Sequence, residues 1–321
     1  MKKSMRMVSA LLLAAAILCG CAGCAGAGKS DVYTVGICQL TQHPALDQAT
    51  KGFREALTEK LGNKVRFNEQ NAQNEATNCS TICNQFVANK VDLILANATP
   101  ALQSAAAATA EIPILGTSIT DYATALNMTD WTGTSGRNIS GTSDLAPLTE
   151  QADMLLTLFP DVKKVGILYC SAEPNSKYQA TVVSDYLATK NVTCTEYTFA
   201  DSNDAAGVAR TACEASDVVY VPTDNTVASN KEVIGQVSLS TKTPIIAGEE
   251  GICAGCGVAT LSIDYYDIGY EAGLMAYDIL VNGADIRTMA VKFAPKTTKK
   301  YNASFCEKLG VTPPEGYTAI G

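Results

Sequence analysis

The run Thr34-Val35-Gly36-Ile37-Cys38 is short and largely β-branched or apolar, and its core Val-Gly-Ile returns at Val165-Gly-Ile. Each copy is followed by a longer segment whose apolar residues recur at helical spacing, such as Leu46, Ala49, Phe53 and Leu57 after the first copy. Short strands that alternate with amphipathic helices are typical of a parallel sheet covered by helices. The sequence therefore predicts an α/β fold.

The same order of elements occurs twice along the chain. We expect strands at 34–38, 64–68, 93–96 and 113–115, and again at 165–169, 193–198, 218–221 and 244–247. Three landmarks match between the sets, at offsets of 130, 125 and 131 residues: Val35-Gly-Ile with Val165-Gly-Ile, Asp92-Leu-Ile-Leu with Asp217-Val-Val-Tyr, and Ile112-Pro-Ile-Leu with Thr243-Pro-Ile-Ile. A nearly constant offset indicates two similar doubly wound lobes rather than one large sheet.

We assign residues 32–143 and about 265–287 to the first lobe, and 144–264 and about 288–321 to the second. The stretch 137–144 is polar, rich in Gly and Ser, and lacks helical periodicity. It is the expected crossing between the lobes, and a hinge is expected there.

The N-terminus has the pattern of a secretion signal. The cations Lys2, Lys3 and Arg6 precede an apolar run at 8–18, which is too short to span a bilayer as a helix. The following Leu18-Cys-Gly-Cys21 resembles the bacterial lipoprotein box. That resemblance implies a signal peptide at 1–20, lipidation of Cys21, and a flexible tether at 21–31 that holds the protein at the outer face of the cell membrane.

Charge and cysteine content narrow the function further. The net charge is −8, and it falls to about −11 once the three cations of the signal are removed, so nucleic acid is not an expected partner. Of the 12 cysteines, Cys79 and Cys83 share a predicted helix face with Ile82 and Phe86, which indicates small buried apolar residues.

A second pair of cysteines, Cys253-x-x-Cys256, lies in a stretch rich in Gly. We interpret it first as a disulfide in a loop, with a redox pair or half a metal site as alternatives. His43 is the only histidine and there is no second Cys-x-x-Cys, so no metal site is expected. Phosphate-binding, nucleophile-elbow and zinc-protease motifs are missing from the sequence, and we expect neither catalysis nor a cofactor.

Polar residues cluster just after the predicted strands, where ligands of doubly wound sheets bind. They are Thr99, Ser118, Thr120 and Asp121 from the first lobe and Glu173, Asn175, Ser176, Thr223, Asp224, Asn225, Thr226 and Glu249 from the second, with Tyr265 near a crossing. The segment that contains Asn175 and Ser176 suits a carboxylate, and Asp224 suits an ammonium. Together they predict a site for a zwitterion, although each of them alone could simply cap a helix. His43 is close to this region, but a lone histidine in a loop is usually polar surface.

Six motifs in order resemble the solute-binding lipoproteins of ABC importers, and more closely the tryptophan/tyrosine-binding subfamily with a type I periplasmic-binding fold. They are His43-Pro-Ala-Leu-Asp47, Ala98-Thr-Pro100, Gly136-Arg-Asn-Ile-Ser-Gly141, Glu173-Pro-Asn-Ser176, Pro222-Thr-Asp-Asn-Thr-Val227 and Ile263-Asp-Tyr-Tyr-Asp-Ile-Gly269. One departure is Asp121-Tyr122, where many relatives have Asp-Pro.

The resemblance implies a monomeric carrier that closes on a free amino acid, most plausibly Trp, Tyr or Phe, and delivers it to a membrane permease driven by an ATPase. It also implies that Thr99 and Asn175/Ser176 hold the ligand carboxylate and that Asp224 holds its ammonium. Two alternatives stay open: a surface sensor with the same fold, and a thiol-redox lipoprotein that uses Cys253 and Cys256.

Overall fold

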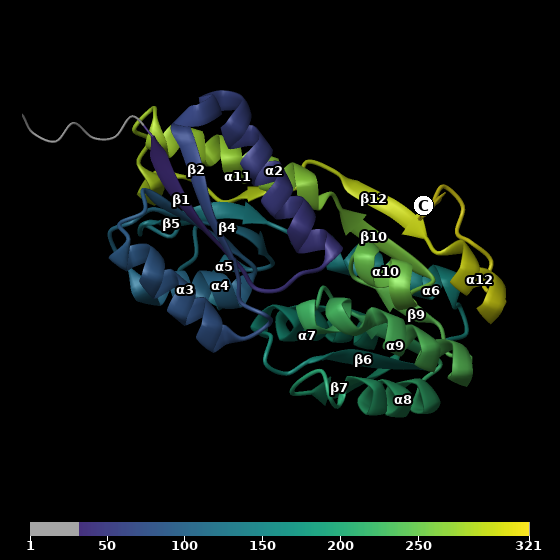
Figure 1. Cartoon of the computed structure of the whole chain (residues 1–321). Helices are drawn as coiled ribbons and strands as arrows, with labels where there is room; N and C mark the ends of the chain where they lie inside the picture. The colour runs from purple at the N-terminus through teal and green to yellow at the C-terminus, as the bar shows by residue number, and fades with distance from the viewer. Residues whose placement is uncertain (1–31, 321) are drawn as a thin grey trace, which may run out of the picture. The chain divides into compact units, whose positions relative to one another are not determined.

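The computed structural model describes residues 32–320, and the chain from Tyr33 onward forms one compact unit with two β-sheets (Figure 1). The predicted signal peptide, Cys21 and the tether lie outside the described residues. Within residues 32–320, no helix combines the length and the apolar character needed to cross a membrane.

The first sheet has six parallel strands in the order β2-β1-β3-β4-β5-β11. Their bounds are β1 (Tyr33–Gln39), β2 (Val65–Asn71), β3 (Leu93–Asn97), β4 (Ile114–Ile119), β5 (Ile139–Ser143) and β11 (Lys292–Phe293). The helices of this lobe are α2 (Pro44–Leu61), α3 (Ala76–Ala88), α4 (Thr99–Ala108), α5 (Tyr122–Ala125) and α11 (Tyr265–Leu280), with short 3₁₀ turns η1 (Gly62–Lys64) and η2 (Ile286–Thr288).

Alternation along the buried strands explains why helices cover both faces of this sheet. Leu93 and Leu95 pack with α2 and α11, whereas Ile94 and Ala96 point to the other face and pack with α3 and α4 (Figure 1). The helices α2 and α11 approach very closely, since a Cβ on Gly269 would lie 2.0 Å from the Ala49 carbonyl oxygen. Glycine is therefore required at that contact.

The second sheet has seven strands in the order β7-β6-β8-β9-β10-β12-β13. It repeats the order of the five strands β2-β1-β3-β4-β5 and continues with β12 and β13 where the first sheet has β11; among its described pairs only β12 and β10 are antiparallel. The strands are β6 (Lys164–Cys170), β7 (Thr193–Phe199), β8 (Val218–Val221), β9 (Ile245–Ala247), β10 (Ala259–Ile263), β12 (Thr297–Tyr301) and β13 (Thr318–Ala319). The helices are α6 (Leu148–Leu158), α7 (Pro174–Thr189), α8 (Ala205–Ala215), α9 (Asn225–Thr241), α10 (Glu250–Cys256) and α12 (Ala303–Leu309).

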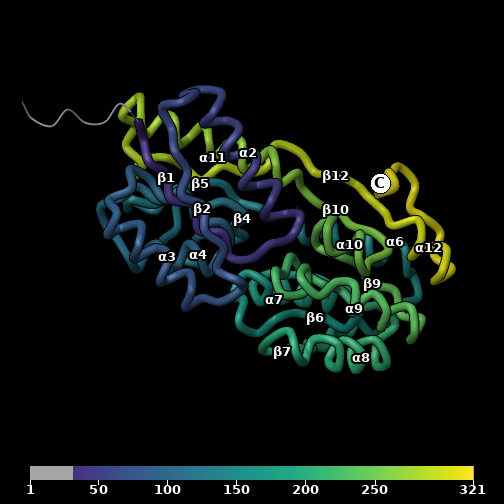
Figure 2. Tube along the Cα trace, viewed as in Figure 1, coloured from purple at the N-terminus to yellow at the C-terminus, as the bar shows by residue number. Residues whose placement is uncertain are grey.

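The predicted α/β class with two doubly wound lobes is confirmed, and all eight predicted strands are present. The predicted crossing at 137–144 is wrong, because Ile139–Ser143 forms β5 and the chain leaves the first sheet only at 144–147. The boundary at about 288 is also too early. β11 still pairs with β5, and the chain reaches the second sheet with β12, a return that can be followed in the trace of Figure 2.

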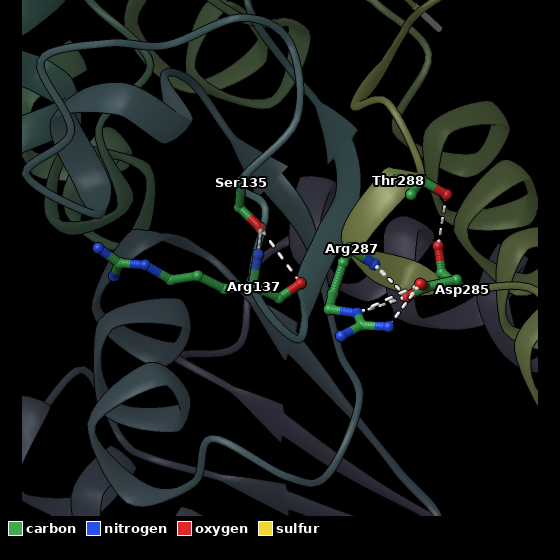
Figure 3. Close-up of polar contacts among 5 residues, drawn as sticks. All are labelled: Ser135, Arg137, Asp285, Arg287 and Thr288. Carbon is green, nitrogen blue, oxygen red and sulfur yellow. Dashed lines mark hydrogen bonds and ion pairs between the residues drawn. The ribbon is translucent and has the colours of Figure 1, made fainter.

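Local hydrogen bonds shape the two segments that lead into β5 and β11 (Figure 3). Before β5, the Ser135 hydroxyl accepts from the Arg137 amide at 3.1 Å and donates to the Ile139 carbonyl at 2.5 Å. Before β11, the Asp285 carboxylate caps η2 and pairs with Arg287 at 2.8 Å. β5 was missed in the sequence because Gly and Ser within it mimic a loop.

The cysteine predictions had opposite outcomes. Cys79 and Cys83 are fully buried on α3, as predicted. Cys253 and Cys256 lie not in a loop but on helix α10, and both are buried and free, so the predicted disulfide is wrong. Burial raises the pKa of both thiols, which disfavours the reactive thiolate that a redox pair needs.

Candidate functional site

A small enclosed cavity of about 10 Å³ lies at the carboxyl ends of the strands, between the two lobes. Its walls come from the end of β4 and from loops and helix starts that follow β1, β5, β6, β8, β9 and β10. The lining residues are His43, Leu46, Ser118, Asp144, Asn175, Thr223, Asp224, Asn225, Ala228, Glu249 and Tyr265. Both sheets have the strand order whose switch point, between β1 and β3 or between β6 and β8, is the usual ligand position.

The lobes contact each other around this cavity. The ring Nε2 of His43 lies 3.1 Å from Oδ1 of Asn225, and Nδ2 of Asn74 donates to the Thr226 hydroxyl at 3.1 Å. Because these bonds join residues more than 150 positions apart in opposite lobes, they hold the cleft shut. A solute of amino-acid size can enter only if the lobes separate.

Glu173 organises the wall from the second lobe. Its carboxylate is 3 % exposed and accepts from the backbone amides of Asn225 and Thr226 at 3.0 and 2.8 Å. It also accepts from the side chains of the same two residues at 2.7 and 2.8 Å. Glu173 thus fixes the start of α9, and its charge is satisfied by these donors.

Two further carboxylates cap helices at the cavity wall. Asp224 accepts from the Val227 amide at 2.7 Å and the Cys170 amide at 2.8 Å, and Glu249 accepts from the Gly251 and Ile252 amides. Burial, with the neighbouring Glu173 charge, raises the pKa of Asp224 well above its usual range, and burial raises that of Glu249 to about 7.

A third lining carboxylate, Asp144, lies where the chain leaves the first sheet. It accepts from the hydroxyls of Thr120 and Tyr265, both at 3.0 Å, and burial raises its pKa. Within residues 32–320, no Lys or Arg forms an ion pair with Asp144, Asp224 or Glu249, and no cluster of His, Cys, Asp or Glu has the geometry of a metal site. The cavity wall is therefore rich in acidic groups that have no cationic partner.

The first lobe contributes strained backbone rather than charge. Ala98, after β3, has φ 90°, and Ser118, in β4, has φ 56°. Positive φ is costly for residues with a Cβ, and such strain concentrates at functional sites. Ala98 is the N-cap residue of α4, and its side chain accepts no hydrogen bond from the helix in the described structure. The first backbone N–H groups of α4, which begins at Thr99, therefore have no side-chain cap.

Three buried polar atoms at the cavity have no hydrogen-bond partner in the described region: His43 Nδ1, Ser118 Oγ and Asn175 Oδ1. Leaving a buried polar atom unpaired costs about 1–3 kcal/mol. Six such side-chain atoms occur in the described region, and three of them line this one cavity. This concentration marks the cavity as the candidate ligand site.

Seven of the residues predicted from the sequence line the cavity: Ser118, Asn175, Thr223, Asp224, Asn225, Glu249 and Tyr265. The others lie nearby without lining it. Glu173, Ser176 and Thr226 are buried in hydrogen bonds around Thr223 and the start of α9, Thr120 bonds Asp144, and Thr99 begins α4. Asp121 instead caps α5 and is partly exposed, as expected of a helix cap.

Two lining residues escaped the sequence analysis. His43, interpreted there as polar surface, is only 7 % exposed, because the loop after β1 turns into the cleft. Asp144 was placed at the end of a hinge, but it is buried at the cavity. The carboxylate role of Asn175 is also contradicted, since its amide N–H groups face Glu173, Ser176 and Thr223 and leave only an acceptor free.

Two lobes of like topology, joined by crossings and closed over an enclosed polar cavity, define a type I periplasmic-binding fold. Residues 34–319 match the family model described as ABC transporter substrate binding protein. The chain belongs to that family.

Several relatives support this membership. The chain is 35 % identical over 291 residues to a "Tyrosine-binding protein" of Clostridioides difficile strain R20291, covering 87 % of this chain and 84 % of that protein. It is 30 % identical to an ABC domain solved in complex with L-Trp from Streptococcus pneumonia, with a TM-score of 0.85, and covers 90 % of this chain and 100 % of that one.

A third relative is a substrate binding protein with adhesive properties from Clostridium difficile, solved in a ligand-free, open form. It is 33 % identical, covers 90 % of this chain and 99 % of that one, and has a TM-score of 0.69. The identity to it is higher than to the L-Trp complex, yet the structural similarity is lower. This difference agrees with the cross-lobe bonds, which describe a closed cleft.

Proposed function

We propose that this protein is the extracytoplasmic binding component of an ABC importer, anchored through a lipid on Cys21 to the outer face of the cell membrane. It binds one free aromatic amino acid (Trp, Tyr or Phe) as a monomer and delivers it to a permease driven by an ATPase. The observation that carries the choice of an amino acid is the presence of Asp144, Asp224 and Glu249 around the cavity, none of which forms an ion pair with a Lys or Arg within residues 32–320.

Groups on the first-lobe side of the cavity suit the carboxylate of the same ligand. Ser118 has a free hydroxyl at the cavity, and α4 begins beside it at Thr99 without a side-chain cap from Ala98 in the described region. Helix starts favour anions through their free amides and dipole. A ligand that carries both charges would pair with both sets of groups, and burying it is favourable only when both pairings form.

Two observations support an aromatic side chain. Two relatives are named or titled for Tyr and L-Trp. In addition, a pocket of about 470 Å³ adjoins the cavity and shares Glu249 and Tyr265 with it, and its walls include Pro44, Ile263 and Tyr266. A partly apolar pocket of this size is adequate for a phenyl or indole ring.

Thermal unfolding of the purified protein against all 20 amino acids, nucleosides and common sugars tests this proposal. A ligand at 100 times its Kd adds about 2.7 kcal/mol to the free energy of unfolding. We expect shifts for Trp, Tyr or Phe alone. A shift only with a sugar or nucleoside would contradict the amino-acid assignment.

Transport is tested separately, because a sensor of the same fold would bind the ligand equally well. We expect loss of the chain, or of lipidation in a Cys21→Ser variant, to reduce uptake of the radiolabelled amino acid by intact cells. Unchanged uptake would favour the sensor.

A further inference from the structure

The hydrogen bonds of Asn225 fix the proton on the ring of His43. Nδ2 of Asn225 donates to the Glu173 carboxylate at 2.7 Å, and a carboxylate only accepts, so Oδ1 must be the atom that faces His43. That oxygen also only accepts, and it lies 3.1 Å from Nε2 of the ring. The proton of His43 is therefore on Nε2.

The other ring nitrogen is left as an acceptor. Burial lowers the pKa of His43, so the ring is neutral near pH 7 and carries a single proton. Nδ1 has no partner in the described region and lines the cavity. A bare, buried acceptor of this kind requires a donor from the ligand.

Asn175 provides a second acceptor by the same reasoning. Its Nδ2 lies 3.2 Å from the Thr223 carbonyl and 3.4 Å from the Glu173 carboxylate, and both groups only accept. The amide orientation is thereby fixed, and Oδ1 is left unpaired at the cavity within residues 32–320. Each oxygen of Asp224 accepts from one backbone amide and keeps a second lone pair, so Asp224 can also accept an N–H from the same group of the ligand.

We infer that His43 Nδ1 and Asn175 Oδ1 directly accept two N–H bonds from the ammonium of the ligand, in addition to the charge that Asp224 contributes beside them. This inference rests on the proposed function and sharpens it. An ammonium with at least two N–H groups satisfies both acceptors. An N-acylated ligand has one N–H and a desamino ligand has none, so the site selects free amino acids.

Two isosteric variants separate the ring nitrogens. In His43→Asn the side-chain oxygen can occupy the place of Nδ1, whereas in His43→Gln the amide nitrogen can keep the bond to Asn225 and the Nδ1 acceptor is lost. The probes are L-Trp, L-Tyr and L-Phe, each with its desamino analogue: indole-3-propionate, 3-(4-hydroxyphenyl)propionate and 3-phenylpropionate. Calorimetry on the full protein gives the Kd values.

We expect His43→Gln to weaken binding of the amino acids about 30-fold. The factor by which His43→Asn weakens binding should be several times smaller. Affinity for the desamino analogues should change little in either variant. A matched control is Asn74→Ala, which removes a cross-lobe bond away from the cavity and should weaken binding of all ligands by the same factor.

If His43→Gln lost affinity equally for amino and desamino ligands, or lost no affinity, the inference would be overturned and the proposed function would stay intact. If the desamino analogues do not bind the wild-type protein, the test is the ratio of the amino-acid Kd values of His43→Gln and His43→Asn. A ratio near one overturns the inference. If another primary amine binds in place of the aromatic amino acids and shows the His43→Gln loss, the proposed function fails and the inference stands.

Discussion

The first and second lobes have the same strand order, but the helices that follow the equivalent strands β3 and β8 start differently. In the first lobe, α4 begins after Ala98, which does not cap the helix with a side chain in the described structure. In the second lobe, α9 is capped by the carboxylate of Asp224, which lines the cavity.

This difference shows how a duplicated scaffold becomes an asymmetric binding site. Equivalent strand ends supply similar backbone positions, and the residue at each helix start sets the sign of the local potential. Uncapped starts favour an anion, and starts covered by buried carboxylates favour a cation. The cleft is therefore dipolar, which matches a zwitterion held between the lobes.

The strongest disruption of the acidic wall is expected from Glu173→Gln. A Gln nitrogen would face donors from Asn225 and Thr226, so the start of α9 would lose its acceptor. We expect a loss of about 3 kcal/mol or more in the free energy of unfolding, and no measurable ligand binding. Urea denaturation and calorimetry measure both effects.

The control for that variant is Glu214→Gln, which breaks an exposed ion pair with Arg210. Its stability should change by less than about 0.5 kcal/mol. Equal effects of the two substitutions would mean that the buried network does not hold the second-lobe wall together.

The acidic wall also predicts how stability depends on pH. The pKa of Glu249 rises from 4.5 to about 7 on folding, so between these values the folded chain holds a proton that the unfolded chain has lost. Stability of the ligand-free protein should then fall as pH rises through this window, by roughly 3 kcal/mol for this group.

Thermal unfolding in a buffer series measures this slope. Glu249→Gln can still cap α10 and does not titrate, so the stability of this variant should depend less steeply on pH. A saturating amino acid should likewise flatten the pH dependence of the wild-type protein. A stability that rises from pH 5 to pH 7 with the same slope in both proteins would contradict the role of Glu249.

On the first-lobe side, Ser118→Gly should separate stability from binding. Glycine relieves the strain of φ 56°, so we expect a gain of about 1 kcal/mol in stability and, from loss of the hydroxyl, about tenfold weaker binding. Ala98→Gly is the matched control, which relieves similar strain without removing a polar group. Weaker stability in both variants would show that these conformations are not strained.

The smallest effect is expected from reductant. Cys253 and Cys256 are free and buried on α10, so dithiothreitol should leave the melting temperature and the amino-acid affinity unchanged. A fall in melting temperature with reductant, lost in the double Cys→Ser variant, would instead indicate a disulfide in the second lobe.

Strands and helices with a strong apolar pattern were predictable from the sequence. The run at 34–38 and its repeat at 165–169 form β1 and β6, and the segment with Leu46, Ala49, Phe53 and Leu57 at helical spacing forms α2. Burial imposes these patterns locally, because a period of two or 3.6 residues sets which side chains face the core. β5 lacked such a pattern and was missed.

The list of polar residues after the strands was also determined by the sequence, because doubly wound topology fixes where strand ends meet. Their roles were decided only by tertiary structure. Whether Asn175 offers a donor or an acceptor depends on Glu173 and Thr223, and the free nitrogen of His43 depends on Asn225 from the other lobe. Such partners lie far apart in the chain, and hydrogen-bond direction is set by what surrounds each group in space.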